Sequence, residues 1–192
     1  MVAQDLLGKT LVRVWHRERI AGRIVETEAY CDSDEPDLAC HASKNNGRPT
    51  GRTAVMFGPP GHIYMYLNYG MHWMFNVVTG RTGQPNAVLI RAVEPLSGEK
   101  IMQAHRAGWP RRQWTNGPAK LTKAFALDKT FNKVNLSHPD GVIWIEAAES
   151  IPTEQIATGA RVGLGKTTPE PWLSIPWRYW IEGNPFVSKA RS

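Results

Sequence analysis

Three side chains at alternate positions of one segment could carry out chemistry together. Residues 22–30 interleave β-branched, apolar and polar side chains with a period of two, which is typical of a β-strand. On that period Glu26, Glu28 and Tyr30 share one face. A carboxylate can activate water and a ring can stack on a flat ligand, so this face favours a catalytic site. A solvated strand surface is the alternative, because a functional carboxylate must also lie in a cleft.

The composition indicates a globular protein with an anionic partner. The 192 residues, 42% of them hydrophobic and 21% charged, fit one domain over residues 1–192. The net charge of +6 favours a polyanion such as nucleic acid, and the basic residues are spread along the chain rather than gathered in a tail. We find neither an apolar run of membrane-spanning length nor a signal peptide, and therefore expect a cytoplasmic protein.

Metal-ligating residue types occur, but not in a metal-binding pattern. Cys31, Cys40 and His41 are fewer than the four ligands of a structural zinc site, and two cysteines are too few for a disulfide scaffold. We therefore expect free thiols rather than a zinc site. A metal-dependent nuclease is the alternative, and its carboxylates would come from an acidic run in a loop without partner motifs: Asp32, Asp34, Glu35 and Asp37.

The remaining pattern predicts an α+β domain with an antiparallel or mixed sheet. Two helices are marked by their first residues: one covers residues 97–107 with Ser97 as N-cap, and the other covers residues 116–127 with Pro118 in its first turn. A shorter helix is expected over residues 2–7. The expected strands cover residues 10–15, 20–30, 61–70, 71–79, 87–95, 142–147 and 177–182.

Six segments occur in an order that resembles one protein family. They read GRIVETEAY, MFGPPGHIYMYLNYGMHWMFNVV, AVLIRAVEPL, NGPAKLTKAFAL, ARVGLG and WRYWIEGNPFVS. In this order they are similar to the 3-methyladenine DNA glycosylases of the alkyladenine type, and the resemblance covers residues 4–188. It implies a single mixed domain around a curved antiparallel β-sheet with surrounding helices.

The resemblance also implies a reaction. Members of this family flip a damaged purine, such as 3-methyladenine, hypoxanthine or ethenoadenine, out of duplex DNA. They then hydrolyse its N-glycosidic bond and leave an abasic site, as a step of base excision repair. They are monofunctional and use no metal or cofactor. We therefore expect a monomeric enzyme whose partner is double-stranded DNA, and the short N-terminus resembles bacterial members, where the protein would associate with the nucleoid.

The family pattern assigns roles to individual residues. Glu28 matches the general base that activates water, and Arg91 matches the residue that helps to hold this water and the backbone. Glu26 is interpreted as structural. Tyr69 matches the side chain that fills the hole left by the flipped nucleotide. Four residues match the walls of the base pocket, the last of them an asparagine that clashes with the amine of guanine: Tyr30, His41, Tyr66 and Asn76.

Further basic residues are interpreted as phosphate contacts, which position an enzyme without reading sequence. The first candidates are Arg48, Arg52, Lys120 and Lys123. Two of them lie with His41 in a long polar loop over residues 32–61, and loops of this length are usually functional or mobile. The same basic face would also suit a non-catalytic nucleic-acid-binding module of this fold. Such a module needs neither Glu28 nor a base pocket, which separates the two hypotheses.

Overall fold

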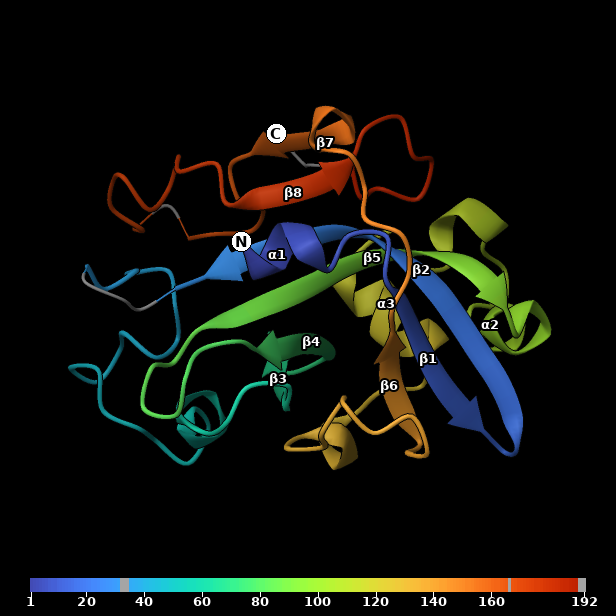
Figure 1. Ribbon diagram of the computed structural model, residues 1–192, viewed down its shortest axis with the longest axis horizontal. Helices are drawn as coiled ribbons and strands as arrows, with labels where there is room; N and C mark the ends of the chain where they lie inside the picture. Colours follow the sequence, from blue (N-terminus) through green and yellow to red (C-terminus); the bar gives the residue numbers. More distant parts are fainter. Residues whose placement is uncertain (32–34, 166, 190–192) are drawn as a thin grey trace.

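Two long antiparallel strands form the spine of the molecule. In the computed structural model, which describes residues 1–31, 35–165 and 167–189, β2 (Glu18–Tyr30) pairs with β5 (Ala87–Ser97) over most of its length. Both strands cross the whole molecule in Figure 1. Their inner residues are β-branched or otherwise apolar, which suits a pleated and buried surface. The architecture is a single α+β domain built on one curled antiparallel sheet.

The sheet divides along β2. The first half of β2 forms a hairpin with β1 (Thr10–Trp15), which pairs in turn with β6 (Ile143–Glu146). The second half pairs instead with β8 (Arg178–Ile181), which carries the short β7 (Ile156–Gly159). Because one strand serves two neighbours in succession, β8 lies apart from β1 and the sheet curls (Figure 1). On the other side of β5 lie β4 (His72–Val78) and β3 (Ile63–Asn68).

A pair of register shifts interrupts the β2–β5 ladder beside the chemically interesting face. The register shifts once between Ile24 and Glu26 and returns between Glu26 and Thr27. The second shift leaves Arg91 of β5 between two paired residues rather than opposite one. Irregularities of this kind re-aim side chains and are frequent next to active sites.

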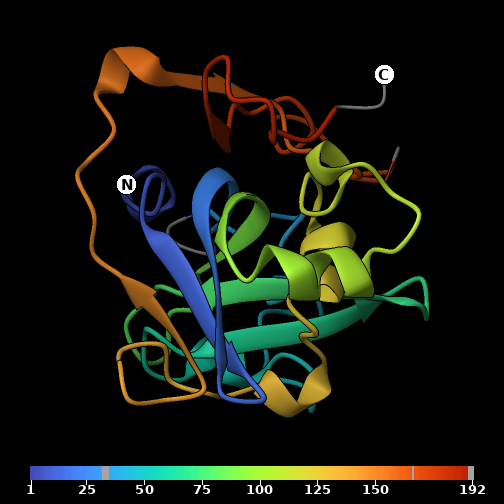
Figure 2. The same cartoon turned by 90° about the vertical axis from the view of Figure 1, so that its right-hand side faces the viewer.

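Three short helices and four 3-10 turns complete the described part of the fold. Helix α3 (Pro118–Ala124) packs against β4 and β5, and α2 (Glu99–His105) lies beside it (Figure 2). The chain leaves β6 along one side of the molecule and climbs to β7, as Figure 2 shows. The remaining elements are α1 (Val2–Asp5) and the 3-10 turns η1 (Ala54–Phe57), η2 (Arg111–Gln113), η3 (Lys129–Phe131) and η4 (Thr153–Gln155).

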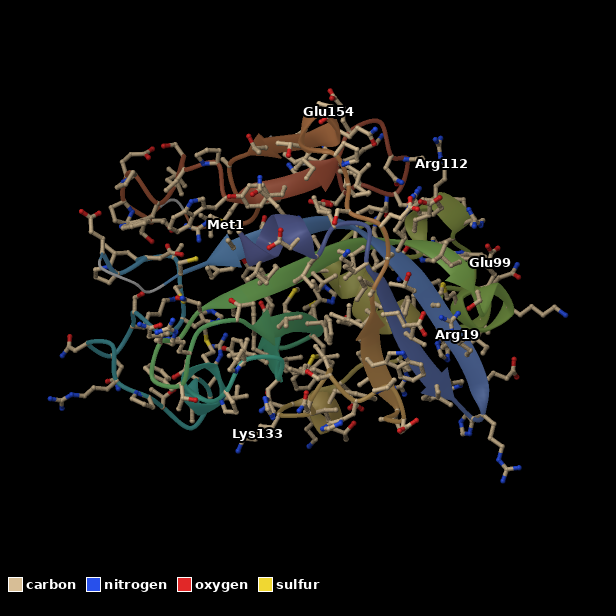
Figure 3. The ribbon with its side chains drawn as sticks, in the orientation of Figure 1. Met1, Arg19, Glu99, Arg112, Lys133 and Glu154 are labelled. Atoms are coloured by element: carbon tan, nitrogen blue, oxygen red, sulfur yellow. The ribbon has the colours of Figure 1, made fainter. Side chains whose placement is uncertain are left out.

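The apolar interior consists of two clusters. The larger one fills the space between the sheet and the helices, with Phe75 and Phe125 fully buried at its centre. The smaller one joins Cys40 and Met56 of the long loop to Tyr64 of β3. The charged side chains labelled in Figure 3 lie instead at the periphery. Burial of the smaller cluster anchors the long loop to the sheet, so the loop can serve as a fixed wall.

The sequence predicted most elements within a few residues, with two errors. Ser97 is not an N-cap: it is the last residue of β5, and α2 begins at Glu99 after Gly98. Gly98 has a φ of 74°, and a Cβ there would lie 2.8 Å from the Arg19 carbonyl oxygen, so only glycine fits this junction. The second error is the omission of β7, whose four residues carry little periodic signal. Among the described residues no helix is long and apolar enough to cross a membrane.

Candidate active site

A tight hairpin projects one aromatic side chain into solvent. Between β3 and β4, Tyr69 and Gly70 have φ angles of 49° and 69°, and the Met71 amide donates to the Asn68 carbonyl at 3.1 Å. Two consecutive positive φ angles are characteristic of a type I′ turn, which matches the twist of the flanking strands. Tyr69 is 81% exposed at the tip of this turn. Its ring therefore contributes little to the core and is available to a partner.

Glu26 lies at the centre of a saturated network. Its Oε1 accepts from Arg91 Nε at 2.7 Å, from Arg178 Nε at 2.8 Å and from the Ser188 hydroxyl at 2.8 Å. Its Oε2 accepts from the Ser188 amide at 2.7 Å. The side chain is fully buried, so these partners offset the cost of removing the carboxylate from water. Glu26 thus ties β2 to the C-terminal segment and has no oxygen to spare.

Glu28 has a different set of partners. Its Oε1 lies 3.0 Å from Arg91 Nη1 and accepts from the Val162 amide at 2.6 Å. Its Oε2 accepts from the Tyr30 hydroxyl at 2.9 Å. Arg91 therefore bridges both glutamates. Burial lowers the pKa of Arg91, but the charges of Glu28 and Glu26 outweigh burial and leave that pKa above its usual value. A guanidinium held in this way keeps the Glu28 carboxylate in one orientation.

A cavity of about 740 Å³ opens beside Glu28, within the usual range of ligand pockets. The three residues that contact Glu28 all line it, whereas neither Arg178 nor Ser188, which hold Glu26, does so. Glu28 itself is 0% exposed, so its three partners form a screen between the carboxylate and the cavity. The aromatic and polar walls include Tyr30, His41, Tyr64, Tyr66 and Asn76.

His41 lies on the loop wall of this cavity and is held uncharged. Its Nδ1 lies 3.0 Å from the Tyr64 hydroxyl, and its Nε2 lies 3.2 Å from Arg52 Nη2. Because a guanidinium only donates, Nε2 is the acceptor of that bond. Burial, followed by the charges of Arg52 and Lys44, lowers the pKa of His41 to about 4. The imidazole is neutral near pH 7, and both ring nitrogens are engaged within the protein.

The tyrosine walls remain protonated. Burial, followed by the charge of Glu28, raises the pKa of Tyr30 well above its usual value. Burial likewise raises the pKa of Tyr66, whose ring stands edge-on to His41 with 4.6 Å between centroids. Arg52 covers Tyr66 from outside, with its guanidinium carbon 5.0 Å from the ring centroid. The cavity therefore offers two uncharged aromatic surfaces of the kind that stack on a planar base.

Asn76 on β4 is held in one orientation by the backbone. Its Nδ2 donates to the Tyr64 carbonyl at 3.0 Å and to the Met74 carbonyl at 3.4 Å. A carbonyl requires a donor, so these contacts fix which end of the amide is nitrogen. The side chain is 3% exposed and lines the cavity. A rigid polar group at this position can exclude a ligand by shape.

Basic side chains surround the mouth of the cavity. Of the four predicted phosphate contacts, Lys120 and Lys123 line the cavity, whereas Arg48 is exposed on the loop away from it. Arg52 lies against His41 and Tyr66, as described above. The cavity is also lined by two basic residues that the sequence analysis did not propose as phosphate contacts, Lys44 and Arg106. Contact with phosphate remains a prediction for Arg48, Arg52, Lys120 and Lys123.

The metal alternative finds no support in the part of the chain that the structure describes. No group of three or more His, Cys, Asp or Glu side chains there could hold a metal ion. Asp37 of the acidic run is fully buried and paired with Arg161, and Glu35 is exposed. Asp32 and Asp34 lie outside the described residues. Cys31 and Cys40 are not joined to each other by a disulfide bond.

Comparison with known proteins matches this architecture to one family. A family model described as methylpurine-DNA glycosylase matches residues 1–185. The chain belongs to the methylpurine-DNA glycosylase family. Relatives from Carboxydothermus hydrogenoformans and Natranaerobius thermophilus, each described provisionally as a 3-methyladenine DNA glycosylase, are 42% identical to it. The matches cover 98% and 97% of this chain, and 93% and 92% of the respective relative. The resemblance inferred from the six sequence segments is thereby confirmed.

The structure adds site residues of this glycosylase-family chain that the sequence analysis did not identify. Val162 contributes only a backbone amide to Glu28, which no residue pattern signals. Arg161, Arg178 and Ser188 reach β2 from more than a hundred residues away. The segments ARVGLG and WRYWIEGNPFVS contain all four, so the six-segment match marked the right stretches without assigning these residues a task.

Proposed function

We propose that this protein is a monofunctional DNA glycosylase that removes damaged purines from duplex DNA. The observation that carries the proposal is the arrangement of Glu28, whose three partners all line a cavity with two aromatic walls. The names of its relatives point to the same activity. Duplex DNA suits the basic mouth of the cavity and the net charge of +6.

Base flipping accounts for the geometry around the cavity. A purine in a duplex cannot reach an enclosed catalytic group, so its nucleotide must rotate out of the stack. Tyr69 stands exposed on a rigid two-residue turn and also lines the cavity, so it can occupy the hole as the base enters. The extruded base would stack on Tyr30, with Tyr66 and His41 forming the other walls. Flipping costs a few kcal/mol of lost stacking and pairing. The cost is lowest for damaged base pairs, so damaged bases are flipped more readily than normal ones.

The chemical step follows from the position of Glu28. A water oxygen attacks C1′ of the sugar while the bond from C1′ to the purine nitrogen breaks, and the electron pair leaves with the base. Glu28 accepts the proton of that water and stabilises the oxocarbenium-like sugar. Arg91 orients the carboxylate through its 3.0 Å contact. Glu26 takes no part in this proposal, because two of its partners, Arg178 and Ser188, lie outside the cavity lining, whereas all three partners of Glu28 line it.

The proposed substrates are purines altered at their edges: 3-methyladenine, hypoxanthine and ethenoadenine. Asn76 would reject normal guanine, because its fixed amide leaves no space for the exocyclic amine. Phosphate contacts would come from the basic side chains at the mouth of the cavity, so affinity should fall steeply with salt, by about 0.9 in log K per logarithmic unit of salt for each phosphate neutralised. A nearly flat salt dependence would argue against this DNA-binding face.

Single-turnover release of hypoxanthine from a duplex oligonucleotide tests the proposal. We expect release by the wild type and a loss of about 10²- to 10⁴-fold in Glu28→Gln, with DNA binding retained. Glu154→Gln, an exposed glutamate at the periphery (Figure 3), is the matched control and should keep the wild-type rate. Binding without release of hypoxanthine, ethenoadenine or 3-methyladenine by the wild type would instead indicate a non-catalytic nucleic-acid-binding module.

A further inference from the structure

One buried arginine joins several segments around the cavity. Arg161 donates from Nη1 to the Ala29 carbonyl at 3.0 Å and from Nη2 to the Trp172 carbonyl at 3.1 Å. The same two nitrogens donate to the two carboxylate oxygens of Asp37, at 2.5 and 2.9 Å. Both side chains of this ion pair are 0% exposed. A bidentate pair of this kind fixes orientation as well as distance.

Asp37 organises the loop that carries His41. Its Oδ1 also accepts from the Ala39 amide at 3.0 Å, and its backbone carbonyl accepts from the Cys40 amide at 2.8 Å. The four residues that follow Asp37 all line the cavity. The carboxylate that Arg161 holds therefore determines where the loop wall stands relative to the sheet.

Arg161 also supports the opposite wall. Its guanidinium carbon lies 4.7 Å from the centroid of the Tyr30 ring and 5.2 Å from that of Trp177. Tyr30 lines the cavity and Arg161 does not, so the guanidinium backs the ring from behind. The next residue along the chain, Val162, donates its amide to Glu28 at 2.6 Å. A displacement of Arg161 would thus move a wall and a hydrogen-bond donor of the catalytic carboxylate together.

We propose that Arg161 and Asp37 form a positioning pair, which sets the spacing of the two pocket walls and of the catalytic carboxylate. This inference rests on the proposed glycosylase function. Neither residue lines the cavity, so both act through others: Arg161 through Tyr30 and Val162, Asp37 through the His41 loop. A misplacement of about 1 Å can cost about 10²-fold in rate, so a buried pair remote from the chemistry can control it.

Arg161→Lys is the principal test, since a lysine keeps the charge but cannot make two parallel bonds to a carboxylate. Single-turnover hypoxanthine release should fall about 30-fold or more, while affinity for a duplex with an abasic-site analogue changes less than about threefold. Glu28→Gln, which should not hydrolyse the substrate, allows binding to be measured alone. When Arg161→Lys is added to Glu28→Gln, the fluorescence change of ethenoadenine on binding should be smaller than in Glu28→Gln alone, because the base no longer stacks on a fixed Tyr30 ring. Asp37→Asn should give the same pattern.

Stability is separated from positioning by the choice of control and temperature. Arg23→Lys alters another arginine–carboxylate pair on β2, to Glu94, outside the cavity lining, and should leave release unchanged. All rates are measured well below the melting temperature of each variant. If Arg161→Lys does not fold, Asp37→Glu, which keeps the charge and lengthens the pair, should show the same loss of rate. Wild-type rates in folded variants of both positions would overturn the positioning role, whereas absence of release by the wild type would overturn the proposed function itself.

Discussion

The Tyr30 hydroxyl donates a hydrogen bond of 2.9 Å to Glu28, two residues earlier on the same strand. The other oxygen of Glu28 is held by Arg91 and Val162, so both carboxylate oxygens are occupied. The carboxylate is also 0% exposed. Of the three partners, the Tyr30 hydroxyl is the one on Oε2, so a water at Oε2 would either replace this hydroxyl or share the oxygen with it. On the proposed mechanism Tyr30 has two separable parts, a ring on which the base would stack and a hydroxyl that would share or yield Oε2 to the water.

Substitution at Tyr30 should separate these two parts. Tyr30→Phe keeps the ring and removes the group that occupies Oε2, so hypoxanthine release should stay within about threefold of wild type or rise. Tyr30→Ala removes the stacking surface, worth about 1–3 kcal/mol per base, and release should fall by about 5- to 150-fold. Single-turnover rates at saturating enzyme measure both. Equal impairment of the two variants would show that the hydroxyl takes part in the chemistry.

The fold could be predicted where local pattern and packing agree. The alternation of residues 22–30 marked β2, and Gly70 marked the turn after β3. The prediction failed at Ser97, where a favourable N-cap residue is overridden by strand pairing with Ala21. It also could not foresee that β2 has different neighbours along its two halves, because that depends on β8 returning from the far end of the chain.

The site could be predicted only where a side chain acts directly. The shared face of Glu26, Glu28 and Tyr30 was visible in the sequence, but the difference between the two glutamates was not. That difference arises from partners distant in sequence: the Ser188 amide donates a hydrogen bond to Glu26, whereas the Val162 amide donates one to Glu28. Phosphate contact remains a prediction for the exposed Arg52, but no local pattern reveals that this side chain also packs against His41 and Tyr66.

The lowered pKa of His41 predicts an acid sensitivity. In the unfolded chain the group has its ordinary pKa of 6.5, and in the folded protein the pKa is about 4. The unfolded state thus takes up a proton first, so stability present above pH 6.5 is lost as the pH falls towards 4. Between pH 6.5 and 4 the melting temperature of His41→Gln should fall less than that of wild type. The melting temperature of Arg52→Gln should also fall less, because the positive charge that repels protonated His41 is gone. Parallel melting curves for wild type and His41→Gln would contradict the prediction.

Asn76 should determine whether normal guanine is tolerated. In Asn76→Ser the shorter side chain would leave room for the exocyclic amine that, on our proposal, the fixed amide excludes. We expect slow but measurable release of guanine from a mismatched duplex, with none from wild type above background. Hypoxanthine release should fall less than about tenfold, since one lost packing contact costs about 1 kcal/mol. An unchanged preference would place the discrimination on another wall of the cavity.

Tyr69 should show opposite effects on stability and activity. A non-glycine residue at a φ of 49° is strained, and glycine adopts this conformation readily, so Tyr69→Gly should leave the melting temperature unchanged or slightly higher. The variant nevertheless lacks the ring that we propose fills the hole in the duplex. Hypoxanthine release from duplex DNA should fall by about 10- to 100-fold, and release from single strands should fall less, because no hole then needs filling.

Lys133→Gly is the matched control for this prediction. Lys133 is exposed at the periphery (Figure 3) and has a φ of 72°, so glycine relieves the backbone there in the same way. Its amide donates to the Ile63 carbonyl at the start of β3, at the other end of that strand from the Tyr69 turn, and glycine keeps this bond. Its duplex activity should equal that of wild type. If Tyr69→Gly lowers the melting temperature by many degrees, the ring supports the fold rather than the DNA. If its duplex activity stays at the wild-type level, another side chain fills the hole, and Met71, 69% exposed on the same turn, is the next to replace.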